Sequence, residues 1–213
     1  MPEEARHVFI AIEGVIGVGK TTLARLLQPY FQSELLLEIV EENPFLPRFY
    51  EDRARYAFQT QIFFLLSRYR QQRIAVPEAL KRGNLISDYL LDKDRIFARL
   101  NLQGDEWEMY ERLYEILADR TVRPDLVVYL RAQLDTLMGR IAMRDRAFER
   151  AMERDYIEEL RRAYEAFFEA YDRTPLLIVG TDRLDYVHRS EDLQAVVGAV
   201  RTMLHEGYRR VTI

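Results

Sequence analysis

A glycine-rich run near the beginning of the chain has the residue types and spacing of a phosphate-binding loop. Residues 14–22 are GVIGVGKTT, which matches G-x-x-x-x-G-K-[ST] without a gap. Glycines let backbone N–H groups converge on phosphate oxygens, and a helix beginning after them adds the partial positive charge of its N-terminus. We predict that Lys20 contacts the terminal phosphates of ATP and that the Thr21 hydroxyl group holds Mg2+. The predicted phosphate-binding residues are Gly14, Gly17, Val18, Gly19, Lys20, Thr21 and Thr22.

The lysine of this loop is informative because the chain otherwise uses arginine. Only Lys20, Lys81 and Lys93 are lysines among 31 basic residues. The plainer interpretation is a glycine turn with a solvated lysine. The motif lies directly between a predicted strand (7–13) and a predicted helix (20–31), and this context favours the phosphate-binding loop.

A second group of candidate residues is the arginine cluster in GRIAMRDR, residues 139–146. Arg140 and Arg144 are four residues apart and share one face of a helix, and Arg146 lies just beyond them. Phosphoryl transfer develops negative charge that guanidinium groups can stabilise, and a mobile lid over ATP would also exclude water. We predict that these three arginines are catalytic residues of a lid over about residues 140–152. The alternative is a solvated basic face that pairs with nearby carboxylates.

Carboxylates follow two of the predicted strands. Glu38 lies near the end of the second strand, and Asp88 lies just after the third. One carboxylate could deprotonate an attacking hydroxyl group, and the other could hold Mg2+. The residue pattern alone does not choose among Glu38, Glu41 and Glu42 for the base.

The elements that would position these residues alternate between apolar strands and amphipathic helices. Strands are predicted over residues 7–13, 35–40, 84–87, 126–130 and 176–180. Helices are predicted over residues 20–31, 51–75, 93–102, 105–120, 134–143, 152–171 and 190–206, and Pro77 is expected to end or kink the second of them. This alternation predicts an α/β fold with a five-stranded parallel sheet and helices on both faces. Ligands of such sheets bind at the carboxyl ends of the strands, where the loop, Glu38 and Asp88 would meet.

Length and composition predict one globular domain over residues 1–213. The chain is 48% hydrophobic and 31% charged, with a net charge of -4 that argues against a nucleic-acid-binding surface. The absence of cysteine excludes disulfides, thiolate metal sites and a cysteine nucleophile. The acidic N-terminus is unlike a signal peptide, and no apolar run approaches the ~18 residues of a membrane span. We therefore expect a cytoplasmic protein that binds neither nucleic acid nor membrane.

Several classes of protein share a phosphate-binding loop of this kind. A GTPase would need a guanine-binding N-K-x-D string, and the sequence contains none. Transport and motor ATPases are usually longer than this chain. The remaining class is the kinases of small molecules, which use Mg2+ with ATP as the phosphate donor.

Two further segments, LEIVEENPFLPRFYED (37–52) and RYAFQTQIFFLLSRYRQ (55–71), resemble the deoxyribonucleoside kinase family, in particular its bacterial deoxyguanosine/deoxyadenosine kinase branch. The resemblance runs from about residue 8 to residue 187. It implies a P-loop kinase fold with an arginine-rich lid. It also implies transfer of the γ-phosphate of Mg-ATP to the 5′-hydroxyl of a deoxyribonucleoside, with deoxyguanosine preferred and deoxyadenosine second.

The resemblance assigns roles around the reacting groups. Glu38 corresponds to the general base on the 5′-hydroxyl, although Ile39 stands where the family usually has proline. SDYLLDKDRIFA (87–98) corresponds to the family's (D/E)-R-S segment, so that Asp88 is the expected Mg2+ contact. Tyr89 departs from that pattern, because the family usually has an arginine there that holds the acceptor near the phosphate. The lid arginines match R-x-x-x-R-x-R, and VGTDRLDYV (179–187) resembles the loop beside the adenine of ATP.

The resemblance also assigns the nucleoside-binding residues. Gln61 and Arg68 correspond to the residues that recognise the base, and their spacing of about two turns places them on one helix face. Asp94 corresponds to the acid that pairs with Arg68, a combination found in purine- and cytosine-accepting members. Tyr50 and Asp155 correspond to the pair that holds the sugar 3′-hydroxyl, with Asp155 shorter than the glutamate common in the family.

Two other functions remain as alternatives. A thymidylate kinase would share the loop and the lid, but Tyr89 replaces the arginine that would receive its acceptor phosphate. A non-catalytic nucleotide-binding relative is the other, and the retained loop, carboxylates and lid arginines speak against it. Apolar stripes on the helices predicted over 51–75 and 105–120 favour a homodimer, since family members usually dimerise through this region.

Overall fold

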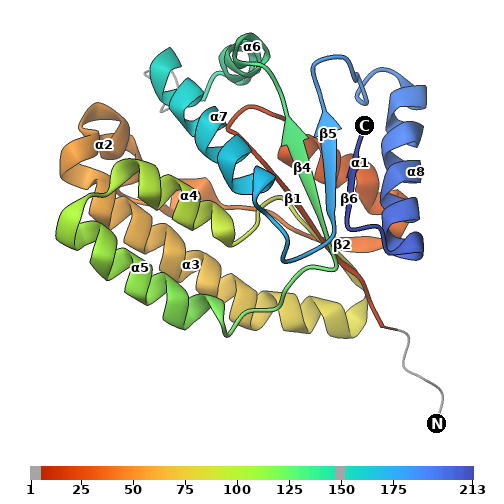
Figure 1. Cartoon of the computed structure of the whole chain (residues 1–213), viewed down its shortest axis with the longest axis horizontal. Helices are drawn as coiled ribbons and strands as arrows, with labels where there is room; N and C mark the ends of the chain where they lie inside the picture. The colour runs from red at the N-terminus through yellow and green to blue at the C-terminus, as the bar shows by residue number, and fades with distance from the viewer. Residues whose placement is uncertain (1–5, 147–151) are drawn as a thin grey trace.

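Among the residues that the structure describes, six parallel strands form one sheet through the middle of the protein (Figure 1). The computed structural model describes residues 6–146 and 152–213. Its strands are β1 (Phe9–Gly14), β2 (Ser33–Leu36), β3 (Asn84–Ser87), β4 (Leu126–Arg131), β5 (Leu176–Gly180) and β6 (Arg210–Thr212). They lie in the order β2-β3-β1-β4-β5-β6, and every neighbouring pair is parallel. The predicted α/β class is confirmed, but the predicted number of five strands is wrong.

The extra strand escapes prediction because β6 is short and its side chains are mostly exposed. Its three residues pair in parallel with β5 at the sheet edge, from Arg210 beside Leu176 to Thr212 beside Ile178. A three-residue strand with a charged and a hydroxylated side chain lacks the apolar run that marks the other strands.

The second strand also ends earlier than its apolar sequence predicts. The predicted strand covers residues 35–40, whereas the observed β2 spans Ser33–Leu36. Leu36 pairs with Ser87, which is the last residue of β3. In the described ranges, β2 has no partner in the sheet beyond Leu36. The chain then leaves the sheet, bonds the Glu38 N–H to Asp88 just after β3, and forms a 3-10 turn at Val40–Glu42.

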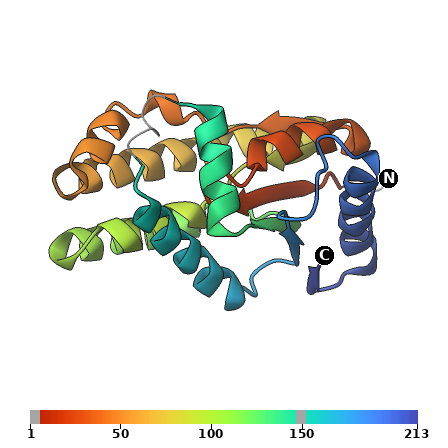
Figure 2. The same ribbon diagram turned by 90° about the horizontal axis from the view of Figure 1, so that it is seen from above.

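Helices cover both faces of the sheet. On one face lie α1 (Lys20–Phe31) and α8 (Ser190–Glu206), and on the other lie α3 (Arg53–Arg82), α4 (Asp92–Asn101) and α7 (Arg154–Glu169). Helix α5 (Gly104–Ala118) packs outside α3 and α4, and the short α2 (Leu46–Glu51) packs against α3. The view from above shows α6 (Leu134–Arg144) crossing the end of the sheet (Figure 2).

Helix α3 runs through Pro77 and ends at Arg82. The predicted end near Pro77 is therefore wrong, and the cap N–H of Gly83 bonds to the carbonyl of Ala79. Proline removes one intrahelical hydrogen bond and costs roughly 3 kcal/mol in a helix interior. Burial of Val76 and Ala79 against Phe9 of β1 offsets this cost.

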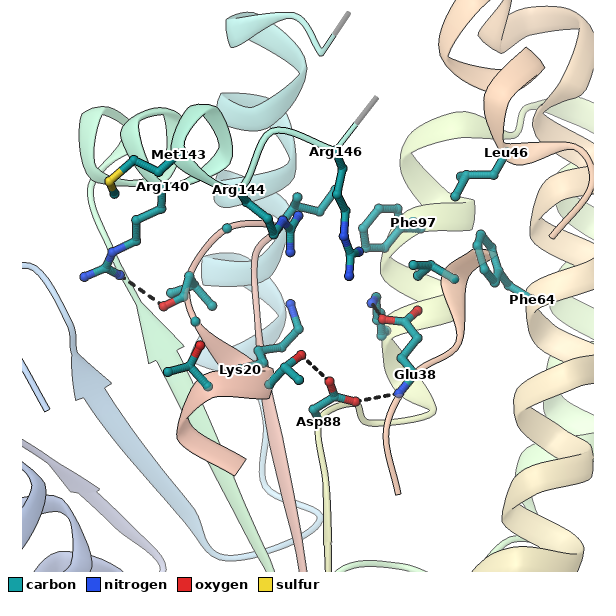
Figure 3. A pocket seen from close by; sticks show the side chains of 18 of the residues that line it. Lys20, Glu38, Leu46, Phe64, Asp88, Phe97, Arg140, Met143, Arg144 and Arg146 are labelled. Atoms are coloured by element: carbon teal, nitrogen blue, oxygen red, sulfur yellow. Dashed lines mark hydrogen bonds and ion pairs between the residues drawn. The ribbon is translucent and has the colours of Figure 1, made fainter. Parts of the chain in front are cut away.

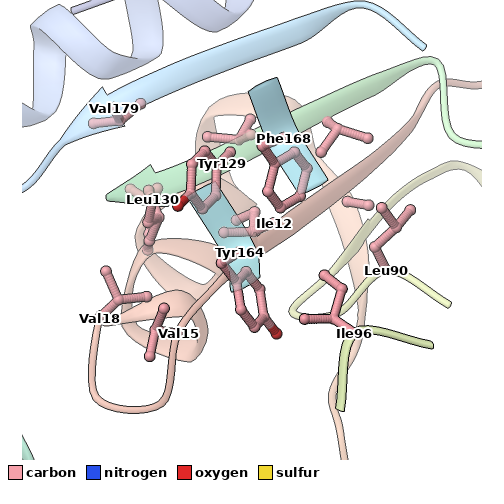
Figure 4. Close-up of a cluster of buried hydrophobic side chains, with 14 of the residues drawn as sticks. Ile12, Val15, Val18, Leu90, Ile96, Tyr129, Leu130, Tyr164, Phe168 and Val179 are labelled. Carbon is pink, nitrogen blue, oxygen red and sulfur yellow. The ribbon is translucent and has the colours of Figure 1, made fainter. Parts of the chain in front are cut away.

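The core below the carboxyl ends of the strands is rich in aromatic rings (Figure 4). Tyr129 of β4 stacks on Phe168 of α7 with ring centroids 4.1 Å apart, and Tyr164 lies next to both. Such pairs contribute about 0.5–1.5 kcal/mol each beyond the burial of their area. This packing fixes α7 against β4, the neighbour of the strand β1 that leads into the glycine loop.

Glu13, at the end of β1, is a fully buried carboxylate beneath the loop. It accepts hydrogen bonds from the N–H groups of Gly14 (2.8 Å) and Leu90 (2.7 Å) and from the Tyr164 hydroxyl (3.1 Å). Burial raises its pKa. The side chain therefore ties β1 to the turn after β3 and to α7, directly under the candidate site.

Within the described part of the chain, no helix has the length and apolarity that crossing a membrane requires.

Candidate active site

One cavity of about 850 Å3 opens at the carboxyl ends of the strands (Figure 3). Its volume suits a small organic ligand. The predicted site residues that line it are Gly17, Val18, Gly19, Lys20, Thr21, Thr22, Glu38, Tyr50, Gln61, Arg68, Asp88, Asp94, Arg140, Arg144 and Arg146. The structure thus brings together residues from the glycine loop, from α3, from the start of α4 and from the end of α6.

Two glycines of the loop hold backbone conformations that a side chain would disturb. Gly14 has a φ of 150°, and a Cβ there would lie 2.5 Å from the carbonyl oxygen of Leu130. Gly17 has a φ of 84°, and its Cβ would lie 2.7 Å from a side-chain carbon of Ile141 on α6. Gly14 does not line the cavity but lets the loop leave β1 close beside β4, and Gly17 lets α6 pack against the loop.

Lys20 points its ammonium group into the cavity. The ammonium donates to the carbonyl oxygens of Gly14 (2.6 Å) and Val15 (3.2 Å). Burial, reinforced by the positive charge of Lys93, lowers the pKa of Lys20 to about 8. A cation that is held by neutral carbonyls in this way gains a charged partner when a phosphate enters the loop.

Thr21 and Asp88 provide neighbouring oxygens at the foot of the cavity. The Thr21 hydroxyl donates to one carboxylate oxygen of Asp88, and the other oxygen accepts from the Glu38 N–H at 2.7 Å. The described residues contain no group of three carboxylate, histidine or cysteine side chains that could hold a metal. Mg2+ bound to a nucleotide needs only one or two protein oxygens besides phosphate and water. The Thr21 and Asp88 oxygens fit that requirement.

The Glu38 side chain lies between two cations that line the cavity. One of its oxygens accepts from the Arg68 guanidinium, and the other accepts from the Lys93 ammonium at 2.5 Å. Burial raises the pKa of Glu38, but the charges of Arg68 and Lys93 outweigh burial and hold that pKa well below its usual range. The carboxylate is therefore ionised and faces the space beside Lys20.

The predicted base-recognising residues line the same cavity, beside Glu38. Arg68 of α3 forms a second ion pair with Asp94 of α4, and its guanidinium lies over the Phe64 ring at 4.5 Å. Gln61 is 2% exposed, and in the described part of the chain its amide oxygen has no hydrogen-bond partner. A buried amide oxygen without a partner beside a cavity indicates a ligand donor at that position. Phe97 lies close by and makes this end of the cavity partly aromatic.

Of the two predicted sugar-binding residues, one lines the cavity and the other does not. Tyr50 is half-buried at the end of α2 and lines the cavity. Asp155 is exposed in the first turn of α7 and does not line the cavity, because Tyr156 and Ile157 are the side chains of that turn that pack inward. The role of Asp155 stays a prediction.

The predicted lid arginines reach the cavity from the end of α6. Arg140 donates to the carbonyl of Val18 (3.0 Å) and to the hydroxyl and carbonyl of Thr181 (2.9 and 2.8 Å), so it is fixed beside the loop. Arg144 and Arg146 point down toward Lys20 and Glu38 (Figure 3). Residues 147–151 of the predicted lid lie outside the described residues. The arrangement could neutralise a transferring phosphoryl group from above.

Lys93 is the main site residue that the sequence analysis does not assign. The sequence does distinguish Lys93, because it is one of three lysines in a chain that otherwise uses arginine. The family resemblance assigns roles to Asp88 and Asp94 near it but none to Lys93. Segment 182–188, which contains part of the predicted adenine loop, also lines the cavity.

Comparisons with known proteins show similarity over nearly the whole chain. A family profile described as "Deoxynucleoside kinase" matches residues 10–205. Deoxyguanosine kinase of Bacillus subtilis is 38% identical over 201 residues, which cover 92% of this chain and 97% of that protein. Deoxyguanosine kinase of Lactobacillus johnsonii is 32% identical over 211 residues, covering 92% of each. The solved structure of deoxyadenosine kinase from M. mycoides with bound dCTP has a TM-score of 0.78 at 26% identity, over 92% of this chain and 100% of that chain.

Proposed function

Because this chain belongs to the deoxynucleoside kinase family, we propose that it transfers the γ-phosphate of Mg-ATP to the 5′-hydroxyl of a purine deoxyribonucleoside. The products are the 5′-monophosphate and ADP. One observation carries the proposal: a single cavity holds Lys20 of the glycine loop, the ionised Glu38, and the buried Gln61 and Arg68 beyond it. Phosphate donor, acceptor hydroxyl and base each have suitable partners in that order.

The residues divide the reaction among them. Glu38 takes the proton of the 5′-hydroxyl as the oxygen forms its bond to the γ-phosphorus, and the bond to the β,γ-bridging oxygen breaks to release ADP. Lys20, Arg144 and Arg146 surround the place where negative charge increases. Mg2+, held by Thr21 and Asp88, would neutralise charge on the donor phosphates.

The preference for a purine rests on Gln61, Arg68 and Asp94. An amide offers a donor and an acceptor to a base edge, and the paired guanidinium offers further donors. The named activities of the Bacillus and Lactobacillus relatives support deoxyguanosine as the first acceptor. Deoxyadenosine is the second, and deoxycytidine is the alternative that the same residues would accept.

The surroundings of Tyr89 favour a nucleoside over a nucleoside monophosphate as the acceptor. Tyr89 is fully buried, and its hydroxyl donates to Gln71 at 2.9 Å. It is not among the cavity residues, so it offers nothing to an acceptor phosphate. This observation argues against the thymidylate kinase alternative.

The test is ADP release from Mg-ATP with five acceptors: deoxyguanosine, deoxyadenosine, deoxycytidine, thymidine and thymidine monophosphate. We expect turnover with the purine deoxynucleosides to exceed turnover with thymidine. Turnover with thymidine monophosphate alone would move the acceptor assignment to the monophosphate kinase. ATP binding without turnover on any acceptor would favour a non-catalytic protein.

We also propose that one domain spans residues 1–213 and that two copies associate. Apolar side chains are exposed on the outer helices: Leu66 and Ile74 on α3, and Met109, Leu113 and Ile116 on α5. The α5 residues recur at helical spacing and therefore share one face, beside α3. An exposed apolar surface of this kind on adjacent helices suits an interface between identical subunits.

A further inference from the structure

Lys93 lies where the site needs a cation and Tyr89 does not supply one. Tyr89 directs its hydroxyl to Gln71, away from the cavity. Four residues later, at the start of α4, Lys93 lines the cavity and contacts Glu38 at 2.5 Å. Its side chain is 8% exposed and its ammonium lies 5.6 Å from the centre of the Phe97 ring.

Lys93 is the second cationic partner of Glu38 in the cavity. Glu38 already pairs with Arg68, and Arg68 also pairs with Asp94. Lys20 of the glycine loop lines the same cavity as Lys93. Two ammonium groups that share one cavity repel each other unless an anion lies between them. The cavity is thus more favourable for both lysines when a phosphoryl group lies between them.

Lys93 also has unused hydrogen-bonding capacity. A lysine ammonium carries three N–H donors. Across residues 6–146 and 152–213, it donates one hydrogen bond, to Glu38. Two donors therefore remain for a ligand in the cavity. The carboxylate that Lys93 contacts is the one that faces the acceptor hydroxyl in the proposed function.

We propose that Lys93 is a catalytic residue that contacts the acceptor 5′-oxygen and the phosphoryl group as it is transferred. This proposal rests on the proposed function. Lys93 stays protonated throughout: the hydroxyl proton goes to Glu38, the new bond joins the 5′-oxygen to phosphorus, and ADP leaves with the electrons of the broken bond. Lys93 then holds the 5′-phosphate of the product. Helix α4 supplies the positive charge that the family pattern places one turn earlier, at Tyr89.

The test compares Lys93→Met, Lys93→Arg and the control Lys81→Met, which makes the same change on an exposed side chain. We expect Lys93→Met to lower kcat with deoxyguanosine by about 100-fold or more, with a smaller change in KM. Lys93→Arg keeps the charge and is expected to recover most of that loss. Equal kcat for Lys93→Met and the control, with an active parent protein, would overturn the role of Lys93 while leaving the proposed function intact.

Binding measurements separate contact with the phosphate from a merely structural role. Calorimetry of Lys93→Met is expected to show weaker binding of deoxyguanosine monophosphate, by about tenfold, and a smaller change for deoxyguanosine. An equal loss for both ligands would overturn the proposal, because a lysine that only positions Glu38 or the helix cannot distinguish them.

Nuclear magnetic resonance of the lysine side chains gives a readout that needs no turnover. With only three lysines, Lys81→Met and Lys93→Arg assign the ammonium signals of 15N-lysine-labelled protein. We expect the Lys93 signal to shift with the monophosphate and much less with the nucleoside. If the parent protein phosphorylates none of the acceptors, the proposed function fails by itself. An unchanged Lys93 signal at saturating monophosphate would overturn the lysine proposal by itself.

Discussion

Replacing Glu38 with glutamine removes the charge of the carboxylate between Arg68 and Lys93 while keeping its shape. A general base contributes about 10²–10⁴-fold to a rate. Because both cations hold the pKa of Glu38 well below its usual range, the carboxylate is a weak base and the lower end applies. We expect kcat to fall by about 100-fold, equivalent to about 2.7 kcal/mol in the activation free energy.

The same substitution should destabilise the fold. Breaking a buried ion pair by removing one partner costs about 3–5 kcal/mol. The glutamine amide still offers one acceptor oxygen, and Arg68 retains Asp94, so we expect a loss near 3 kcal/mol. For a chain of this length each kcal/mol shifts Tm by about 2–4 °C. Because the pKa of Glu38 is below its ordinary value of 4.5, the ionised carboxylate contributes its full stabilisation above that pH and less as the pH falls below it. The difference in stability between the parent protein and Glu38→Gln should therefore shrink in acid.

Two assays and a matched control decide between outcomes. Steady-state kinetics with deoxyguanosine measures kcat, and thermal denaturation without ligands measures stability. Glu42→Gln makes the same change on an exposed carboxylate and should match the parent protein in both. Full activity of Glu38→Gln would refute the assignment of the base. Loss of activity in Glu42→Gln instead would show that the base had been placed four residues too early.

Other predictions follow from the same cavity and from the outer helices. The Lys20 ammonium has a pKa of about 8, and a bound phosphate raises that pKa. The affinity for a non-hydrolysable ATP analogue should therefore be constant below pH 8 and fall above it, by up to about tenfold per pH unit. An affinity that does not change with pH would contradict this prediction. Asp94→Ala should alter the ratio of kcat/KM for deoxyguanosine and deoxycytidine by at least about tenfold, more than it lowers kcat on the better substrate. Ile116→Asp, at a side chain that is 59% exposed, should convert a dimer to a monomer in light scattering at micromolar concentration, whereas a monomeric parent protein would contradict the proposed association.

The sequence was most informative where chemistry depends on neighbours along the chain. The glycine loop is a continuous run between a strand and a helix, so its residues and both flanking elements could be predicted together. Helix α1 begins at Lys20 as expected, and β3 and β5 have the predicted bounds. Glu38 was assigned as the base through the family resemblance, because the residue pattern alone does not distinguish Glu38 from Glu41 and Glu42.

Features that depend on distant parts of the chain were not predictable in the same way. The end of β2 is determined by where β3 stops pairing, and β6 exists only because β5 offers an open edge. Lys93 joins the site because α4 turns back over Glu38, a contact across 55 residues of sequence. Local periodicity carries no information about such contacts, and only the unusual choice of lysine hinted at this one.

The order of the sheet strands has a consequence for how the protein is made. The central strand β1 is synthesised first, but its neighbours β3 and β4 begin at Asn84 and Leu126. The apolar segment Phe9–Gly14 must therefore wait, unpaired, through more than a third of translation, and its edge toward β4 stays open through more than half. Non-local pairing of this kind slows folding and exposes nascent chains to aggregation. The glycine loop is complete only when β4 lies beside it and α6 packs on Gly17. Nucleotide affinity should consequently be gained late, after Arg144 has emerged, and it can report when the nascent chain has assembled the middle of its sheet.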